Sequence, residues 1–398
     1  MKLHEQTYIQ DLLTKTPECE EFLYPFMKYV HRDTTIAELA LMTGTSLNAL
    51  FYGLERTIKR AEQNRCNYDE MKCMLLKPGR INIAGLVNFL WQNAFINELQ
   101  RRAQKLGIDL NMHIFPKHEK KRFQNYLSLC RNADDLPEIL IGKGFSSFMT
   151  SRFIGRFVKP GYFRNPLPEV KMSSIFRQAG MADADNDYHP FGVEEMIMVH
   201  DKTVQPNAET PSSWDDILTP RYRGTLAQMG KNRRDHFGFA TMLYLYADHG
   251  EQSIKQYAAN VKNKQHFSSI VKNIGRNHTE AAPINVMHQF AGMFIRSEAQ
   301  DKTEVIVTCD GNPAVCNFFL VKNKADSQAL AIASHLYSPQ IRAILEKCGT
   351  NHITSNTLLS NNTGVRWIGW NTIKTLPHPY MKEYLSEIAF NNYKIRIS

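Results

Sequence analysis

Short polar stretches that follow predicted strands hold the side chains best suited to bind a solute. In "GKGFSSF" (142–148), Gly144 lets the backbone approach a ligand closely, and Ser146 and Ser147 offer hydroxyl groups at a helix start. The free backbone N–H groups of such a start suit an anion. The alternative is an ordinary turn in which one serine caps the helix. A nucleotide phosphate loop is not indicated, because no Gly-Lys-Thr or Gly-Lys-Ser occurs.

A basic stretch, "MGKNRRDHFGF" (229–239), places three further candidate ligand contacts around a second helix start. These are Arg233, Arg234 and His236. The planar guanidinium group of arginine can donate two parallel hydrogen bonds to a carboxylate or a phosphate. A solvated basic turn is the alternative, and we expect one of the two arginines to face water.

Four more candidates stand near the ends of predicted strands. Asn88 and Phe89 follow "GRINIAGLV", and His288 ends a strand that begins with "PINVM". Asp310, in "VTCDGNPAV", either accepts a hydrogen bond from a ligand or holds the turn beside Gly311, and we favour the turn. Ligands of parallel α/β sheets gather at the carboxyl ends of the strands, so we include all four in the predicted ligand site.

Two acidic residues leave the charge of the ligand open. Glu194 and Glu195 adjoin a predicted chain crossing, and one of them could pair with a cationic ligand. That possibility conflicts with the anion that the basic and serine-containing stretches favour.

Signatures of metal binding and catalysis are weak. His113 and His118 lie in an exposed-looking basic turn, and Cys309 and Cys316 are separated by six residues, unlike a zinc site. We therefore predict no metal ion and no cofactor. The sequence holds no Gly-x-Ser-x-Gly elbow, no dinucleotide glycine fingerprint and no His-Glu-x-x-His. We predict a protein that is not an enzyme, although a scattered catalytic triad would leave no signal in one sequence.

From about residue 77 onward, predicted strands and helices alternate. "GRINIAGLV", "IDLNMHIF" and "LPEILIG" are typical of buried strands, and "NFLWQNAFINELQRRAQKLG" is typical of an amphipathic helix closed by Gly107. Such alternation predicts a mostly parallel sheet covered by helices. A long strand, "HPFGVEEMIMVHD", leaves this lobe, and "TEVIVTCDGNPAVCNFFLVKN" returns to it. Between them lies a second series that includes a helix ending in "SIKQYAANVKN"; after the return we predict one helix, "SQALAIASHLYSPQIRAILEKCG".

The front of the chain, about residues 1–70, is predicted to form short helices. Within residues 34–60, Leu47, Leu50, Phe51, Leu54 and Ile58 recur at helical spacing after a turn at Gly44. Two helices and a glycine turn also describe a helix-turn-helix DNA reader. Residues 1–70 carry eight Lys/Arg against eleven Asp/Glu, although the whole chain has a net charge of +9. DNA affinity comes mostly from phosphate neutralisation, so we favour a small docking domain with a protein partner over a nucleic-acid reader.

Composition points to a globular protein. Hydrophobic residues make up 43% of the 398 residues, no run is long and apolar enough to span a membrane, and the first residues lack the apolar core of a secretion signal. The seven cysteines are scattered, without Cys-x-x-Cys, which is typical of reduced thiols. We therefore expect a cytoplasmic location and no membrane insertion; a removed signal peptide would make the protein periplasmic or extracellular.

An ordered set of segments resembles the type II periplasmic solute-binding proteins of ABC importers, in the branch that handles iron(III), polyamines and phosphorylated sugars. The resemblance covers about residues 76–371. It rests on "LPEILIGKGFSSFM", "PFGVEEMIMVHDKTV", "SSWDDILTPRYRGTLAQMG", "EVIVTCDGNPAVCNFFLVKN" and "LYSPQIRAILEKCGT". The chain departs from that family in its helical front segment, which resembles small helical modules of unknown function. The paired tyrosines that bind iron(III) in some relatives are also absent.

The resemblance implies a two-lobed α/β fold preceded by a small all-α domain. It places lobe 1 at about 77–190 and 311–398, and lobe 2 at about 195–307, within a solute-binding module of residues 71–398. The hinge is expected at Phe191, Gly192, Thr308 and Gly311. We therefore predict a solute-binding protein that captures a small polar solute between its lobes by hinge closure, and we favour an anionic solute. The alternatives are a ligand-sensing transcription regulator and an enzyme on the same scaffold.

Overall fold

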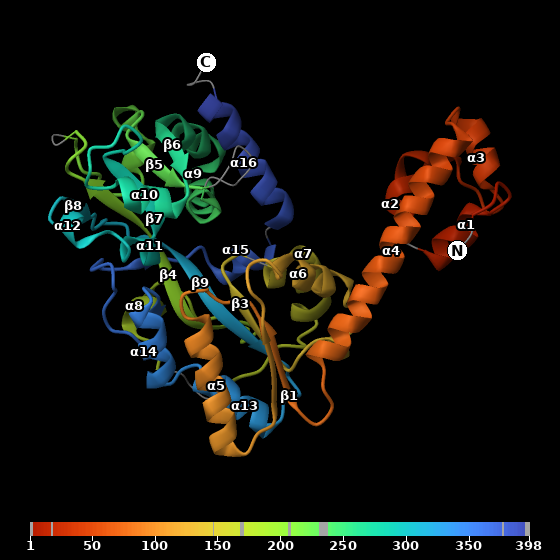
Figure 1. The fold of residues 1–398 in the computed structure, drawn as a ribbon, viewed down its shortest axis with the longest axis horizontal. Helices are drawn as coiled ribbons and strands as arrows, with labels where there is room; N and C mark the ends of the chain where they lie inside the picture. The colour runs from red at the N-terminus through yellow and green to blue at the C-terminus, as the bar shows by residue number, and fades with distance from the viewer. Residues whose placement is uncertain are drawn as a thin grey trace. The chain divides into compact units, whose positions relative to one another are not determined.

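The chain folds into two compact units, Met1–Met74 and Leu75–Ser398, each of which is described by itself. A computed structural model describes residues 3–16, 19–145, 147–167, 171–205, 208–230, 238–375 and 378–394. Figure 1 labels many of the elements of both units along the chain.

The first unit is helical. Its elements are α1 (Ile9–Lys15), α2 (Cys19–Leu23), the short η1 (Tyr24–Tyr29), α3 (Ile36–Thr43) and α4 (Leu47–Leu75). Thr35 caps α3, because its hydroxyl accepts a hydrogen bond from the Glu38 N–H at 3.2 Å while the Glu38 carboxylate accepts from the Thr35 N–H at 2.8 Å. Gly44 ends α3 with a φ of 64°, a conformation that glycine adopts without strain. The two predicted helices are confirmed, although α4 continues well beyond the predicted stretch.

The second unit is built on one continuous sheet. Its strands are β1 (Ile81–Gly85), β2 (Leu110–Ile114), β3 (Ile139–Lys143), β4 (His189–Asp201), β5 (Leu226–Met229), β6 (Val261–Gln265), β7 (Ile284–His288), β8 (Thr303–Val305), β9 (Asn312–Val321), β10 (Asn351–His352) and β11 (Val365–Arg366). The strand order is β2-β1-β3-β9-β4-β7-β5-β6, with β8 and β10 paired to β4 and β11 paired to β9.

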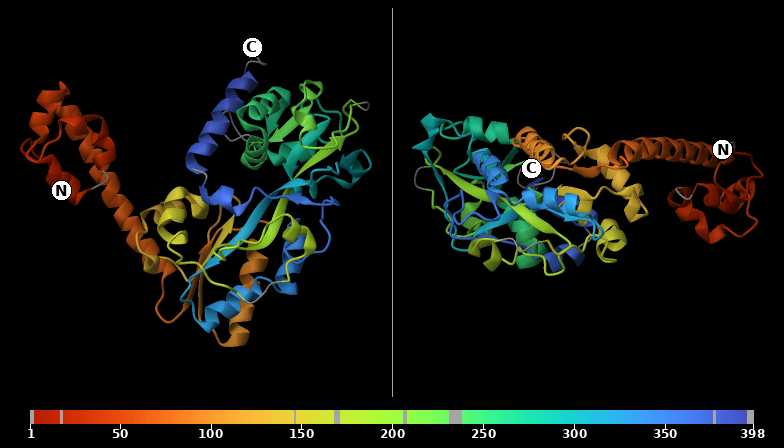
Figure 2. Two further views of the ribbon diagram at one scale, coloured as in Figure 1. Left: turned by 180° about the vertical axis from the view of Figure 1, so that it is seen from behind. Right: turned by 90° about the horizontal axis from the view of Figure 1, so that it is seen from below.

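Two long strands, β4 and β9, connect two lobes within this unit. β4 pairs with β9 from His189 to Glu195 and with β7 from Met196 to His200. The first lobe therefore contains β2, β1, β3, most of β9 and the first half of β4, and the second lobe contains the rest of β4 with β7, β5 and β6. Figure 1 shows β4 and β9 running through the junction, and the view from behind in Figure 2 shows the same pair. The chain crosses where β4 changes partners, between Glu195 and Met196.

Helices surround both lobes (Figure 2). They are α5 (Gln92–Leu106), α6 (Lys120–Leu129), η2 (Ala133–Asp135), η3 (Ser147–Met149), α7 (Ser151–Phe153), η4 (Ile154–Val158), α8 (Ser174–Gln178), η5 (Asp216–Leu218), η6 (Pro220–Tyr222), α9 (Phe239–Asn260), α10 (Phe267–Asn273), α11 (Gln289–Gly292), α12 (Ser297–Gln300), α13 (Ser327–His335), α14 (Pro339–Lys347), α15 (Trp370–Thr375) and α16 (His378–Lys394). None of the described helices is long and apolar enough to cross a membrane.

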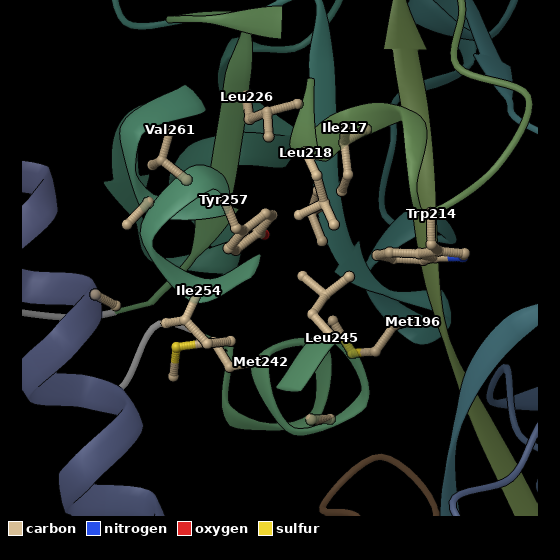
Figure 3. Close-up of a cluster of buried hydrophobic side chains, with 14 of the residues drawn as sticks. Met196, Trp214, Ile217, Leu218, Leu226, Met242, Leu245, Ile254, Tyr257 and Val261 are labelled. Carbon is tan, nitrogen blue, oxygen red and sulfur yellow. The ribbon is translucent and has the colours of Figure 1, made fainter. Parts of the chain in front are cut away.

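Each lobe has its own hydrophobic core. In the first lobe, Trp91, Phe95 and Leu99 from α5 and the residue before it pack with Phe191 of β4. In the second lobe, a cluster around the fully buried Trp214 joins β4, β5 and α9 (Figure 3). Separate cores allow two lobes to move as rigid bodies without repacking either interior.

Three predicted elements differ from the structure. The single helix predicted over residues 327–349 is divided into α13 and α14, because Pro339 starts a new helix that Ser338 caps by accepting from the Ile341 N–H at 3.3 Å. The helix predicted through residue 263 ends at Asn260. The residues after it form β6, whose backbone pairs with β5 in parallel.

The third difference concerns the C-terminal helix. The resemblance places residues 311–398 in the first lobe, but α16 packs against α9 of the second lobe. Leu385 and Ala389 of α16 are buried in the same cluster as Ile254 of α9. The apolar face of α16 is therefore satisfied by the second lobe, and the chain passes between the lobes once more after β9.

Candidate functional site

A pocket of about 440 Å³ lies between the two lobes. Phe89 and Lys117 of the first lobe follow β1 and β2, while most of the remaining wall comes from the second lobe. The described lining residues are Phe89, Lys117, Met229, Gly230, Gly238, His266, Phe267, His288, Phe290 and Lys382. They come from the carboxyl ends of β1, β2, β5, β6 and β7, from the start of α9 and from α16, so the pocket occupies the sheet edge where α/β proteins bind ligands.

A buried polar cluster adjoins the pocket wall at His288. The carboxylate of Glu194, which is fully buried, accepts hydrogen bonds from Lys143 Nζ at 2.7 Å and 2.8 Å. Asn88 Nδ2 donates to the same carboxylate at 2.9 Å. His288 Nδ1 lies 3.9 Å from Glu194 Oε2, beyond hydrogen-bond distance. The structure thus brings together Asn88 and His288, both predicted, with Lys143 and Glu194.

Burial and the positive charge of Lys143 together determine the protonation states of Glu194 and His288. Burial raises the pKa of the Glu194 carboxyl, but the positive charge of Lys143 and the hydrogen bonds from Lys143 and Asn88 outweigh it, so the pKa lies below its ordinary value. Burial lowers the pKa of His288 to about 4, despite the attraction of Glu194. At neutral pH the cluster therefore holds one paired carboxylate, one ammonium group and an uncharged imidazole.

Glu195 points to a different set of partners. Its carboxylate accepts from Asn312 Nδ2 at 2.9 Å, Asn351 Nδ2 at 2.8 Å and Ser360 Oγ at 2.7 Å. Burial raises its pKa, and the three hydrogen bonds only partly offset this effect. Glu194 and Glu195 are thus both occupied by protein groups, and neither lines the pocket, which weakens the case for a cationic ligand.

The predicted glycine and serine loop lies at the end of β3. Gly144 has a φ of 60°, and its N–H donates to the Cys316 carbonyl at 2.8 Å, so this glycine holds the turn beside β9. Ser147 begins η3, and Ser146 lies outside the described residues. The predicted basic residues Arg233, Arg234 and His236 also lie outside the described residues, although Gly230 and Gly238 on either side of their segment line the pocket.

Asp310 lies in a network that ties the second crossing to the second lobe. Its carboxylate accepts from the Trp214 backbone N–H at 3.1 Å and from the Arg366 guanidinium group at 2.9 Å. Trp214 Nε1 donates to Asn312 Oδ1 at 3.3 Å. Asp310 is not among the described lining residues of the pocket. The geometry therefore favours its role in the turn over ligand contact.

The predicted hinge residues lie on both sides of the lobe junction. Phe191 is buried in the first lobe's core, and Gly192 packs against Leu345 of α14, so both precede the partner change in β4. Thr308 and Gly311 belong to the turn before β9; Asn362 Nδ2 donates to the Thr308 hydroxyl at 3.0 Å. Gly311 has a φ of 76°.

Several residues of the pocket and of the buried cluster behind it are not predicted by the sequence. Lys143, in the cluster, lies within the glycine loop but is not among the candidates. His266 and Phe267, in the pocket wall, are missed because the start of β6 is interpreted as the end of a helix. Had "VKNKQ" been recognised as a strand, the same strand-end argument that selected His288 would have selected His266 and Phe267. Lys382 had no such signal, because it lies on a helix distant in sequence.

The model of the bacterial extracellular solute-binding proteins matches residues 134–376, which is more than half of the chain. The chain belongs to this family of solute-binding proteins. The match confirms the resemblance on which the sequence interpretation rested and the two-lobed fold. The family is extracellular by description, so it lends no support to the predicted cytoplasmic location.

Solved structures of iron-binding proteins share the fold of this solute-binding protein. A protein from Trichodesmium in complex with iron and citrate has 13% identity and a TM-score of 0.55, covering 80% of this chain and 99% of that one. Ferric iron-binding protein A of Mannheimia haemolytica, in an open conformation, has 12% identity and a TM-score of 0.55, covering 78% and 98%. The ferric binding protein of Campylobacter jejuni has 14% identity and a TM-score of 0.51, covering 79% and 98%. No curated protein sequence matches the chain.

Proposed function

We propose that this solute-binding protein captures a small anionic solute in the interlobe pocket. The observation that carries the proposal is the charge of the pocket wall. Its described charged residues are Lys117 and Lys382, and none of its described lining residues is acidic. A wall with one sign of charge between low-dielectric lobes attracts a solute of the opposite sign.

The buried carboxylate behind the wall does not reverse this charge. Glu194 is paired with Lys143, and Asn88 donates to it as well. Because the pair is neutral as a whole, it does not offset the positive charge that Lys117 brings to the described pocket wall. The imidazole of His288 has one N–H donor in its neutral form, which is the form that burial favours.

We also propose that the two lobes close around the solute. The connections that would bend are few, because β4 and β9 run through both lobes and each lobe packs around its own core. A solute that contacts Phe89 and Lys117 on one side and His288 and Phe290 on the other would favour the closed arrangement by its contacts with both walls.

A thermal-shift screen of the full chain tests the proposal. Inorganic phosphate, sulfate, citrate and phosphorylated sugars form the anionic arm, and spermidine is the cationic control. A solute at 100 times its dissociation constant stabilises the folded protein by about 2.7 kcal/mol. We expect a rise in melting temperature with at least one anion and none with spermidine. Stabilisation by spermidine alone would contradict the proposal.

Two further measurements separate binding from closure and from catalysis. Small-angle scattering with and without a saturating anion should give a smaller radius of gyration with the anion. An unchanged radius would contradict lobe closure but not anion binding. Mass spectrometry of the recovered solute should find it unaltered, as expected of a binding protein. A converted product would support the enzyme alternative.

The cytoplasmic location and the protein partner are separate proposals. The six cysteines whose side chains are described form no disulfide bond, as is usual in a reducing compartment. We propose that Leu41 and Tyr52 of the first unit, which are exposed to 84% and 67%, belong to the surface that a partner would contact. Cell fractionation tests the location. Cross-linking in cells should give a product that the variant Leu41→Asp loses.

A further inference from the structure

The wall of the interlobe pocket is aromatic as well as basic. Phe89 enters from the first lobe and is 60% exposed, while Phe267 and Phe290 enter from the second lobe. The rings of Phe89 and Phe290 meet edge to face, with centroids 6.3 Å apart, and those of Phe267 and Phe290 are 5.9 Å apart. Aromatic side chains therefore reach the pocket from both lobes.

Two imidazoles extend this aromatic wall. His288 stacks on Phe290 with centroids 5.7 Å apart and an interplanar angle of 20°, and His266 lies 4.6 Å from Phe267. Five rings thus form a continuous run along the pocket, from Phe89 to His266. A phenylalanine ring as exposed as that of Phe89 leaves apolar surface in water, and a flat apolar partner would cover it.

We infer that the solute carries an aromatic ring attached to its anionic group, as in an aromatic carboxylate or an aromatic phosphate ester. This inference rests on the proposed function and narrows its ligand class. The ring of the solute lies against Phe89 and Phe267, and its anionic group faces Lys117. A pocket of about 440 Å³ lies within the range of about 300–1,000 Å³ that is usual for small-molecule sites.

Other classes of ligand use this wall less completely. A bare oxyanion such as phosphate would engage the lysines and leave the ring of Phe89 exposed. A metal ion finds no carboxylate and no tyrosine among the described lining residues, and the described part of the chain holds no group of three His, Cys, Asp or Glu suited to a metal. The aromatic anion is the class that engages both features of the wall.

Isothermal titration calorimetry of the full chain with matched pairs of probes tests the inference. The pairs are phenyl phosphate against inorganic phosphate and benzoate against acetate, with benzylamine as an aromatic cation. We expect each aromatic anion to bind at least about tenfold more tightly than its partner, and benzylamine not to bind. Inorganic phosphate and phenyl phosphate binding equally would overturn the aromatic inference and leave the proposed function intact. Binding of benzylamine but of no anion would overturn both.

Removing the exposed ring gives a second test. Phe89→Ala should weaken phenyl phosphate binding about tenfold and inorganic phosphate binding much less, because only the aromatic ester loses a ring contact. Tyr162→Ala is the matched control, since Tyr162 is 43% exposed and is not among the lining residues. An equal loss with both phosphates, or none with either, would contradict the placement of the ring against Phe89. Thermal unfolding of each variant checks that it is folded.

Discussion

The ammonium group of Lys143 lies 2.7 Å and 2.8 Å from the two carboxylate oxygens of Glu194, a residue with no exposed surface. The two side chains come from β3 and β4, which are separated by β9 in the sheet. The pair therefore spans three strands at the end of the first lobe that adjoins the pocket. It neutralises the carboxylate that lies 3.9 Å from His288 Nδ1, and it holds β4 in place just before the strand crosses to the second lobe.

Replacing this lysine should destabilise the protein strongly. Lys143→Met leaves the carboxylate of Glu194 buried without its cation, a change that costs about 3–5 kcal/mol in comparable buried pairs. Urea unfolding of the variant measures the loss. The double variant Lys143→Met/Glu194→Gln removes the charge as well and should recover part of the stability. A loss below about 1 kcal/mol in the single variant would contradict the importance of the pair.

The same pair gives a prediction about pH. Because the pKa of Glu194 is lowered in the folded state, the stability from the pair is present above the ordinary carboxyl pKa and is lost as the pH falls through the lowered value. The difference in unfolding free energy between the wild type and Lys143→Met should therefore shrink in acid. A difference that stays constant from pH 7 to pH 3 would contradict this assignment.

Buried histidines should make the fold sensitive to mild acid. Burial lowers the pKa of His189 to about 4, below its ordinary value of 6.5. Between these two pH values the unfolded chain binds the proton and the folded chain does not, so stability falls as the pH drops from 6.5 to 4, by about 2–3 kcal/mol. His189 stacks on Phe319 with centroids 5.1 Å apart, so His189→Phe should keep the packing and flatten this slope.

Urea unfolding at several pH values measures the slope. His118→Asn serves as the control for the loss of a histidine, because the side chain of His118 is 80% exposed. The control should keep the acid sensitivity of the wild type. The prediction is wrong if His189→Phe and the wild type lose the same stability between pH 6.5 and pH 4.

The fold was predictable because its strands and its caps are encoded locally. The thirteen residues predicted as the crossing strand are those of β4, and Gly107 ends α5 in the left-handed conformation that its position suggested. β6 was not predictable in the same way. Its sequence, "VKNKQ", is polar and continues a helix, and only pairing with β5 makes it a strand.

The site was harder to predict from the sequence than the fold, because its residues lie far apart along the chain. The strand-end argument found Phe89 and His288, which line the pocket, and Asn88, which lies behind it. It could not find Lys382, because nothing local indicates that α16 returns to the second lobe. Nor could it show that Glu194 is neutralised, since its partner Lys143 is 51 residues away.

Asp310 should matter for stability and not for binding. Asp310→Ala removes the acceptor of the Trp214 backbone N–H and one of the two carboxylates that pair with Arg366, the other being Asp248. A buried donor left unpaired costs about 1–3 kcal/mol. Urea unfolding should detect that loss, whereas calorimetry with phenyl phosphate should find an unchanged affinity. If the folded variant no longer binds phenyl phosphate, Asp310 contacts the ligand and the prediction is wrong.

The full chain should not bind duplex DNA in a salt-dependent manner. α3 and α4 form the two helices that a helix-turn-helix reader also has, but the first unit is net acidic and phosphate neutralisation dominates such binding. A fluorescence-anisotropy titration with random duplexes at two salt concentrations measures this. Tight, salt-sensitive binding that Arg56→Ala weakens would favour the regulator alternative.

Lys117 should contribute directly to anion affinity. It is exposed in the loop between β2 and α6 and lines the pocket from the first lobe, so Lys117→Gln removes a positive charge from the described pocket wall. Hydrogen bonds to charged groups contribute about 1.5–3 kcal/mol, so we expect the affinity for phenyl phosphate to fall at least about tenfold. Calorimetry at two salt concentrations should show a smaller salt dependence in the variant. Lys105→Gln, at an exposed lysine in the last turn of α5, is the matched control and should bind as the wild type does. Equal losses in both variants would mean that the net charge of the protein, and not the pocket wall, attracts the anion.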